Sequence, residues 1–585
     1  MTGTQEEFPV LTMGSGQVIA RVDGDTLYMS GSFKNLGGDY TNSHFHRGLA
    51  GTTGGIQIAT IPVIDSTKRA GTYSEAVNKY VLTAAQKTMI ANREFYFNVH
   101  STTAPGGEIR GQLVPEAEAY FHSNLVSSNE IPPITTPAHG SFFIELNGDK
   151  IVLSGSAKEI ASGYTNSHLH LGYAGQSGGV SVALKPSFSD TANKTTVNFL
   201  ATENTYTLTA NQLAALKAHQ LYGNIHSTAY PAGEMRGQVA PVANARFRVY
   251  FSGTNEPVAV TTQASGGLFI NMTDSVAVVS GSFSGLESDL AVNVRLGAHI
   301  HQGMAGRNGG IQYDLKNILN ADKRSGTFLA DSNTFKFTTT NMNDLLARRL
   351  YSNVHSLNYQ GGEIRGQIVP EVQNIFFGYL NGMQENRAQL STGRGNVVVE
   401  LNGNRLTLSG SGERLLDKIN RNGFAHIHRR TVGQNGPINI PLSLEHAADS
   451  LSAIFPASAN GYSVSTGMID SLRRRLTYVN IHTSKAPGGE IRAQLLGEAV
   501  YYFHSILSGE GETNAVVTTG SGGVIGELQT NRNVIYSGSF ARLDAKWNGG
   551  GSFFWGLSGI NGPGRQKFIF FVAAGSFGGV FLSPF

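Results

Sequence analysis

Hydrophobic and polar residues alternate in short runs along most of the chain, a pattern that predicts β-strands with two unlike faces. Residues 141–146 and 151–156 show this alternation on either side of an Asn147-Gly148 dipeptide, so we expect a strand, a tight turn and a second strand. The same arrangement returns at residues 397–401, 402–403 and 406–410. The alternation therefore predicts a fold built from antiparallel hairpins.

Short helices interrupt the strands at a regular place. Thr83 and Gln86, and again Thr209 and Gln212, have the spacing of a capping box, in which two side chains satisfy the free N–H groups at a helix start. The signal is weaker later in the chain, where the counterparts are residues 344–348 and 470–473. We expect one short helix in each repeat of the pattern.

A three-histidine pattern occurs four times, and each time a Gly-Glu-x-Arg phrase closes it. The first copy has His44-x-His46, then Asn98-x-His100, then the closing phrase 107–112. The third histidines of successive copies are about 127 residues apart, which is the size of a domain rather than of a solenoid repeat. We expect copies at residues 1–115, 116–241, 242–371 and 372–496, and a degenerate, incomplete fifth at 497–585.

The two ends of the array depart from the pattern. The first copy lacks the apolar opening strand that the second has at 119–123. The fifth copy has the opening strand, but it has neither the histidines nor the closing phrase. Glycine makes up 72 of 585 residues, as expected for many turns. The fold class predicted is all-β, a tandem array of antiparallel β-sandwich domains with one short helix in each.

The connections between copies are only a few residues long, so neighbouring domains must abut. A compact domain of this size is roughly 35 to 40 Å across, and four in a row would form a stiff rod on the order of 150 Å long. The glycine-rich run 48–55 lacks the Lys-Ser/Thr of a phosphate loop, so we interpret it as a turn with positive φ.

Charge and composition exclude several classes of protein. A net charge of +3 over the whole chain, without a basic stripe, argues against nucleic-acid binding. The absence of cysteine excludes disulfide scaffolds, thiol nucleophiles and cysteine-ligated zinc. The first residues do not form a signal peptide. Residues 568–585 carry no charge, and a native strand, a cleaved anchor signal and an altered end remain open there; membrane association is not expected.

Strand periodicity places the histidines on one face. Because side chains two apart in a strand point the same way, His44 and His46 share a face, as do Asn98 and His100. The same rule places Glu, Arg and Gln of residues 108–112 together. A short hairpin between the last two strands would bring His100 close to the Glu and Arg of that phrase.

Two interpretations of this polar face stay open. Three imidazoles suit a zinc or copper ion, with Glu108 as a fourth ligand or as a group that orients a histidine. Alternatively the face is a structural network, in which Glu108 pairs with Arg110 and the histidines bond to backbone. The candidate metal ligands are His44, His46, His100, His168, His170, His226, His299, His301, His355, His426, His428 and His482. The candidate structural network comprises Glu108, Arg110, Glu234, Arg236, Glu363, Arg365, Glu490 and Arg492.

These phrases resemble the CHRD domain, the module named after chordin and also found in bacterial secreted proteins. The matching elements are His-x-His with Gly-x-x-Gly, Asn-Val-His-Ser/Thr, and the phrase Pro-Gly-Gly-Glu-Ile-Arg-Gly-Gln at 105–112. The resemblance implies an extracellular β-sandwich similar in shape to Cu/Zn superoxide dismutase. It supplies no further metal ligands and no catalytic residue. Chordin binds growth factors through cysteine-rich modules, which this chain lacks.

Three hypotheses of function follow, none of them enzymatic. The first is an extracellular or cell-surface structural or adhesive protein whose rods associate head to tail with further copies of themselves, or bind an extracellular protein or glycan. The second is a protein that binds zinc or copper at one three-histidine site per domain. The third is a multivalent protein that binds a ligand or a growth factor.

Overall fold

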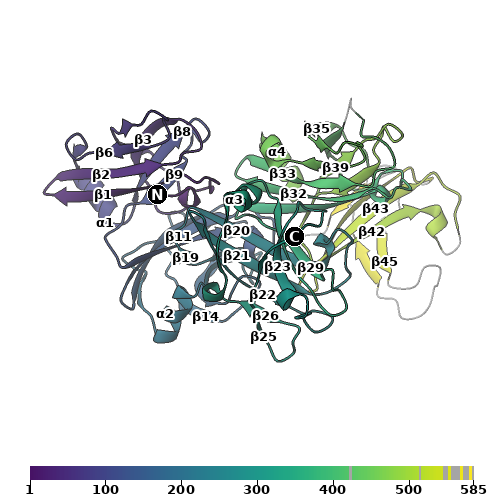
Figure 1. Ribbon diagram of the computed structural model, residues 1–585, viewed down its shortest axis with the longest axis horizontal. Helices are drawn as coiled ribbons and strands as arrows, with labels where there is room; N and C mark the ends of the chain where they lie inside the picture. Colours follow the sequence, from purple (N-terminus) through teal and green to yellow (C-terminus); the bar gives the residue numbers. More distant parts are fainter. Residues whose placement is uncertain (421–423, 513–514, 545–550, 555–566, 571–578, 583–585) are drawn as a thin grey trace.

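The computed structural model describes residues 1–420, 424–512, 515–544 and the strands at 551–554, 567–570 and 579–582. The fold is all-β, as predicted, and every strand pair in this part of the chain is antiparallel (Figure 1). In the second, third and fourth copies a single curled sheet wraps around that copy's own hydrophobic core. The predicted β-sandwich class is therefore confirmed.

The second copy shows the complete arrangement, with the sheet order β14-β13-β17-β18-β10-β11-β12-β15. Its opening strand β10 lies between the two halves, paired with β11 along its length and with β18 at Val126 and Arg236. The elements are β10 (Ala119–Val126), β11 (His139–Asn147), β12 (Lys150–Lys158), β13 (Tyr164–Leu171), β14 (Val180–Ala183), β15 (Val197–Phe199), β16 (Thr205–Thr207), α2 (Ala210–Lys217), β17 (Leu221–Ser227), β18 (Met235–Gln238) and β19 (Ala240–Pro241).

The third and fourth copies repeat this order. The third contains β20 (Ala245–Ser252), β21 (Ser265–Thr273), β22 (Val276–Ser284), β23 (Ala298–Gln302), β24 (Ile311–Asp314), β25 (Ile318–Leu319), β26 (Gly326–Phe328), β27 (Thr334–Lys336), α3 (Thr339–Leu346), β28 (Leu350–Val354), β29 (Ile364–Gln367) and β30 (Val369–Pro370). The fourth contains β31 (Asn374–Asn381), β32 (Arg394–Asn402), β33 (Arg405–Glu413), β34 (Ala425–Arg429), β35 (Ile438–Pro441), β36 (Glu445–His446), β37 (Ala453–Phe455), β38 (Gly461–Ser463), α4 (Thr466–Arg473), β39 (Thr477–Ile481), β40 (Ile491–Gln494) and β41 (Leu496–Gly497).

The first copy forms two sheets, because no full opening strand joins its halves. Only Thr2 bridges them, pairing with Arg110 on one side and Ser15 on the other. The elements are β1 (Ser15–Asp23), β2 (Thr26–Lys34), β3 (Tyr40–Arg47), β4 (Ile56–Ala59), β5 (Val63–Ile64), β6 (Gly71–Tyr73), β7 (Lys79–Val81), α1 (Ala84–Ala91), β8 (Phe95–Ser101) and β9 (Ile109–Gln112).

The fifth copy retains the opening strand and the hairpin that follows it. The described strands are β42 (Tyr501–Ser508), β43 (Ser521–Leu528), β44 (Val534–Ala541), β45 (Gly551–Phe554), β46 (Lys567–Phe570) and β47 (Gly579–Leu582). The alternatives for the uncharged end at 568–585 fall largely outside the described residues. No helix in the described part of the chain is long and apolar enough to span a bilayer.

The predicted hairpin and helices are present. The first predicted hairpin is β11 and β12, with Gly148 at φ +61° in the turn. Capping boxes start α1 at Thr83 and α2 at Thr209. In the later copies Thr338 and Ser465 cap α3 and α4 with single side-chain bonds, so both helices begin before the segments that the sequence indicated.

Successive copies dock through one repeated contact. Ser156 in β12 of the second copy donates its hydroxyl to the carbonyl of Ala50 in the first, at 2.7 Å. Beside it Gly51 has φ +85°, and a Cβ there would lie 2.7 Å from the amide nitrogen of Ser141 in the second copy. The glycine-rich run is therefore a turn, as predicted, and it is also the docking element. The later junctions use Ser282 and Ala174 at 2.8 Å, Ser411 and Ala305 at 2.7 Å, and Ser539 and Val432 at 2.7 Å.

A buried ion pair reinforces three of the four junctions. Arg348 of the third copy donates to both carboxylate oxygens of Glu400 in the fourth, at 2.8 and 2.7 Å. Both side chains are nearly inaccessible to solvent. Arg93 with Glu145 and Arg475 with Glu527 form the same bidentate pair at the first and last junctions.

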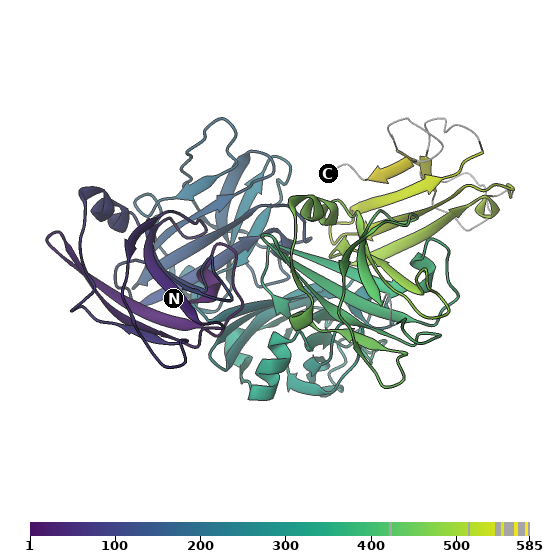
Figure 2. The same cartoon turned by 90° about the horizontal axis from the view of Figure 1, so that it is seen from above.

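The linkers fold the array back on itself, which corrects the expected rod. Ser128 of the second copy donates to the carbonyl of Val372, in the linker before the fourth copy, at 2.7 Å. Asn402 of the fourth copy donates to the carbonyl of Pro9 in the first, at 2.8 Å. Copies that are two or three positions apart in the chain thus touch. The copies form a compact body rather than a line (Figures 1 and 2). The linkers are short, as predicted, but they bind earlier copies instead of spacing the copies out.

Removing one partner of a buried junction pair should destabilise the array. Glu400→Ala leaves the Arg348 guanidinium buried without its counter-ion, and we expect a loss of about 3 to 5 kcal/mol at that junction, seen as a lower unfolding temperature by calorimetry. Glu445→Ala is the matched control, because its pair with the neighbouring Arg349 crosses the same junction but is exposed. Exposed pairs contribute about 0 to 1 kcal/mol. Equal effects of the two substitutions would contradict the assignment.

Candidate metal centre

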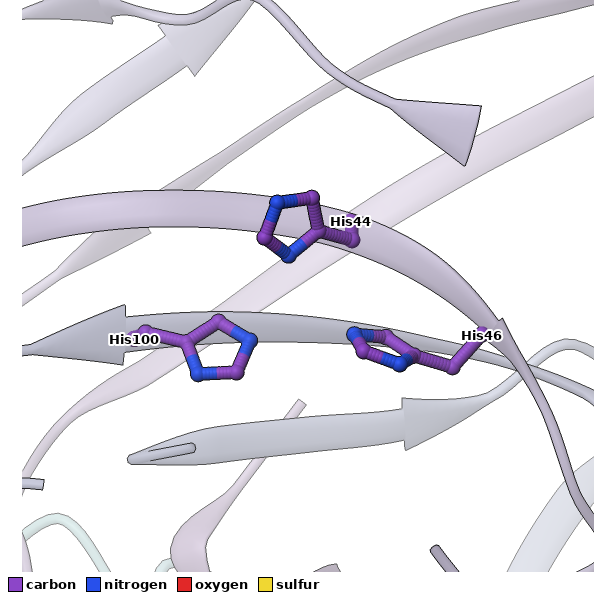
Figure 3. Close-up of side chains that lie close together, drawn as sticks. All are labelled: His44, His46 and His100. Carbon is purple, nitrogen blue, oxygen red and sulfur yellow. The ribbon is translucent and has the colours of Figure 1, made fainter. Parts of the chain in front are cut away.

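Two neighbouring strands hold the three histidines of each copy. In the first copy β3 pairs with β8 so that His44 lies opposite Asn98, and His100 lies opposite Asn42. His44 and His46 are two apart on β3 and share a face, as strand periodicity predicted. Figure 3 shows the three rings converging between the two strands. The candidate ligands are therefore brought together in the first copy.

The same convergence occurs in all four copies. One nitrogen from each histidine lies within 4.8 Å of the other two in each of the four triads. In the first copy the ring centroids of His44 and His100 are 5.3 Å apart, and those of His44 and His46 are 5.4 Å apart. The other triads are His168, His170 and His226; His299, His301 and His355; and His426, His428 and His482.

Backbone carbonyl groups fix the tautomers of two histidines in every triad. His46 Nδ1 lies 3.0 Å from the carbonyl oxygen of Gly54, and His100 Nδ1 lies 3.0 Å from that of Pro105. A carbonyl oxygen only accepts, so each Nδ1 carries the proton and each Nε2 presents a lone pair to the centre. The equivalent acceptors are Gly178 and Pro231, Gly309 and Gln360, and Gly436 and Pro487.

The inner nitrogens of the third copy face each other without a proton to share. His299 donates from Nε2 to the carbonyl of Arg295 at 2.7 Å, so its Nδ1 is bare. This Nδ1 lies 3.1 Å from Nε2 of His355, which is also bare because Nδ1 of that ring donates to Gln360 at 2.9 Å. Two lone pairs this close repel each other. A cation between them removes the repulsion.

Burial keeps the triads neutral. Desolvation lowers the pKa of all twelve histidines, and it lowers the pKa of His301, His355 and His426 to about 4. Protonation of a ring therefore does not relieve the repulsion near neutral pH. Neutral imidazole is the form that binds zinc and copper. Desolvation is likewise the largest cause for His44, His46, His100, His168, His170, His226, His299, His428 and His482.

A stack of three side chains supports the second histidine of each triad. His46 lies parallel to the ring of Tyr96, with centroids 5.0 Å apart, and the guanidinium of Arg110 lies over that ring, 3.5 Å from its centroid. The tyrosine hydroxyl accepts the amide of Gly54, the residue whose carbonyl binds His46. The same stack occurs with Tyr222, Tyr351 and Tyr478. These tyrosines are not among the candidate residues predicted from the sequence, although each stands four residues before the third histidine.

Glu108 does not join the histidines, contrary to the role considered for it. Strand β9 begins only at Ile109, so the alternation of faces does not extend to Glu108. Its carboxylate accepts bonds from Thr12 and from the hydroxyl of Ser101, and one from the amide of Gly37 at 2.6 Å. Glu108 thus anchors loops; it neither orients a candidate metal ligand nor pairs with Arg110. Glu234, Glu363 and Glu490 anchor the corresponding loops through Ala161, Glu287 and Leu416.

Arg110 and its equivalents bind the glycine-rich turn that contacts the next copy, instead of a glutamate. Arg110 is 1 % exposed and donates to the carbonyls of Leu49 at 2.9 Å and Thr52 at 2.7 Å. Arg236 bonds to Tyr173, Arg365 to Met304 and Arg307, and Arg492 to Thr431 and Gln434. The predicted polar network exists as two separate parts, one around the glutamate and one around the arginine.

A second buried carboxyl lies beside each arginine. In the first copy it is Glu6, whose Oε2 accepts a bond from Asn98 at 3.3 Å. Burial raises the pKa of Glu6 to about 7, and the nearby Arg110 offsets part of that rise. Gly107, at φ +133°, leaves the room that the Glu6 carboxylate needs, since a Cβ at position 107 would lie 2.7 Å from Glu6 Oε1. Glu130, Glu256 and Glu385 occupy the same place with the same raised pKa.

The repeat matches the model of a known protein family. The family model of the CHRD domain matches residues 1–113, 121–239, 247–368 and 376–495. These are the four copies that carry the histidines, and the matches leave the degenerate fifth uncovered. A comparison with curated proteins found no match for the chain.

The four buried glutamates should make stability fall as pH rises. Their folded pKa of about 7 exceeds the ordinary value of 4.5, so the folded state favours the proton and stability is lost as pH rises from about 4.5 through 7. The change corresponds to about 3 kcal/mol per carboxyl. We expect the quadruple Glu→Gln variant to gain unfolding temperature over wild type between pH 5 and pH 8, by an amount that grows with pH.

The four positions changed are Glu6, Glu130, Glu256 and Glu385. Titration of the histidines is common to both proteins and cancels in the difference. Glu116→Gln is the control, because Glu116 is exposed. A difference that stays constant across the pH range would show that these carboxyls are ionised in the folded protein.

Proposed function

Because the chain belongs to the CHRD domain family, whose members are extracellular-type domains without a known enzymatic activity, we propose that it is an extracellular metal-binding array with one transition-metal site in each of four copies. The proposal is of binding and does not include catalysis. It assigns the twelve histidines of the four triads as ligands. Zinc and copper are the ions whose ligand preferences suit three neutral imidazoles.

One observation carries this proposal, the pair of bare nitrogens His299 Nδ1 and His355 Nε2 at 3.1 Å. Ligand nitrogens about 2.0 to 2.1 Å from a tetrahedral ion lie about 3.3 Å from each other. The corresponding nitrogens are 3.4 Å apart between His168 and His226, and 3.3 Å apart between His426 and His482. In the third copy the separation supports an ion at the centre better than a histidine–histidine hydrogen bond, because the outer nitrogens of both rings donate to carbonyl groups. In the second and fourth copies the same distances fit the same ion.

The backbone bonds to the outer nitrogens also support the proposal. An imidazole that binds a metal through one nitrogen commonly donates from the other to a carbonyl or carboxylate, which fixes its orientation. In every triad at least two rings have such a partner, and in the third copy all three do. In this arrangement each ring uses one nitrogen for the backbone bond that a structural role requires. The other nitrogen of the same ring stays available to a metal ion.

Elemental analysis tests the proposal. Protein purified without chelators and without nickel affinity should carry four zinc or copper ions per chain, because four triads are present. The double variant His301→Ala, His355→Ala should carry three, and His446→Ala should still carry four because His446 is exposed and outside the triads. Metal content near zero, with no change in unfolding temperature on adding zinc or copper, would overturn the proposal.

The repeated junctions favour a second function, a structural or adhesive array. The same serine-to-carbonyl bond joins every pair of successive copies, and the linkers bind copies further back. Such an array could present equivalent sites to further copies of itself, or to an extracellular protein or glycan. Sedimentation velocity from dilute to concentrated solution tests self-association. A monodisperse monomer throughout would exclude it.

A further inference from the structure

The candidate metal centre and the contact between copies share one turn. In the first copy this docking turn comprises residues 47–55, from the last residue of β3 to the residue before β4. It follows His46 directly, and Gly54 near its end accepts the Nδ1 proton of that histidine. Its middle, Ala50 and Gly51, is the surface on which the second copy docks. One short segment therefore links a candidate ligand to the next domain.

The backbone of the turn is held at five of its nine carbonyls. Gln112 donates to Gly48 at 2.7 Å, and Arg110 donates to Leu49 and Thr52. With the bonds to Gly54 and Ala50, five carbonyls of the turn have side-chain donors. A segment this constrained moves as a unit, so a displacement at His46 reaches the docking surface.

The arrangement recurs in each histidine-bearing copy. In the fourth copy His428 donates to Gly436 at 2.9 Å, while Ser539 of the fifth copy donates to Val432. Gly433, at φ +82°, lies against the fifth copy, where a Cβ would come within 2.6 Å of the amide nitrogen of Gly523. The second and third copies use 171–179 and 302–310 in the same way.

We infer that metal occupancy of each centre and docking of the following copy are thermodynamically coupled. The inference rests on the proposed metal sites and concerns their regulation. A metal ion at Nε2 withdraws electrons from the ring, which makes the Nδ1 proton a stronger donor to the turn carbonyl. A firmer turn presents Ala50 and its equivalents in the docked geometry. By linkage, docking must then raise metal affinity by the same factor.

The fifth copy isolates this effect. The family matches do not cover it, and it contains no triad in the residues that the structure describes. Its bond to a docking turn, from Ser539 to Val432, is made with the fourth copy. We expect zinc or copper to slow amide hydrogen exchange in β43 and β44 of the full-length protein. His428→Ala should abolish that protection, while the other three centres still bind metal.

The reciprocal experiment removes the docking bond and measures metal affinity. The quadruple variant Ser156→Ala, Ser282→Ala, Ser411→Ala, Ser539→Ala should bind zinc or copper about fivefold more weakly than wild type. The matched control changes Ser154, Ser280, Ser409 and Ser537 to Ala. These serines lie two residues earlier on the same strands and are buried with no hydrogen-bond partner for their hydroxyls. The control should keep wild-type affinity.

The outcomes separate the two proposals. Four ions bound with unchanged exchange in β43 and β44, or equal affinity in the two serine variants, would overturn the coupling and leave metal binding standing. Absence of bound metal in wild type would overturn the proposed function itself. If the interface variant proves unstable, the exchange comparison between wild type and His428→Ala still decides the question, since it leaves every docking serine in place.

Discussion

The fold of each copy depends on satisfying a buried guanidinium with backbone carbonyl groups. Arg110 is fully buried, and removing a cation from water is costly unless its N–H groups find partners. The partners are the carbonyls of Leu49 and Thr52 and the face of Tyr96, which together fix the turn after β3. That turn in turn holds His46 and receives the next copy. Histidine geometry and domain packing are therefore both consequences of one buried charge.

Strand periodicity predicted the histidine face because the residues concerned sit inside regular strands. His44 and His46 on β3, with Asn98 and His100 on β8, lie as alternation requires. The rule failed at Glu108, which precedes β9 and follows Gly107 at φ +133°. A backbone that leaves the extended region before a strand no longer keeps its side chains on the expected face. The closing phrase therefore looked like one polar cluster but divides into two.

Contacts between copies could not be read from the sequence for a different reason. Most acceptors at the junctions are backbone carbonyls, which every residue has, so Ala50 or Val372 carries no mark of its role. The donors are ordinary strand and turn serines such as Ser156 and Ser128. Only the bidentate pairs leave a trace, since Arg93, Arg348 and Arg475 each precede their glutamate by 52 residues. Short linkers alone suggested a rod, because linker length indicates how close successive copies lie but not how the copies are oriented.

The structural and the metal-binding interpretations of the triads are not exclusive. The structural one needs hydrogen bonds to backbone, and the outer nitrogens of the rings supply them. Those bonds leave the inner nitrogens unprotonated, and burial prevents a second proton from being added near neutral pH. In the third copy, a network that served structure alone would gain nothing from pointing three lone pairs at one another. It would be more stable if one inner nitrogen kept a proton to share. The third copy, where every outer nitrogen is occupied by a carbonyl, is therefore the strongest argument that the rings are arranged for a cation.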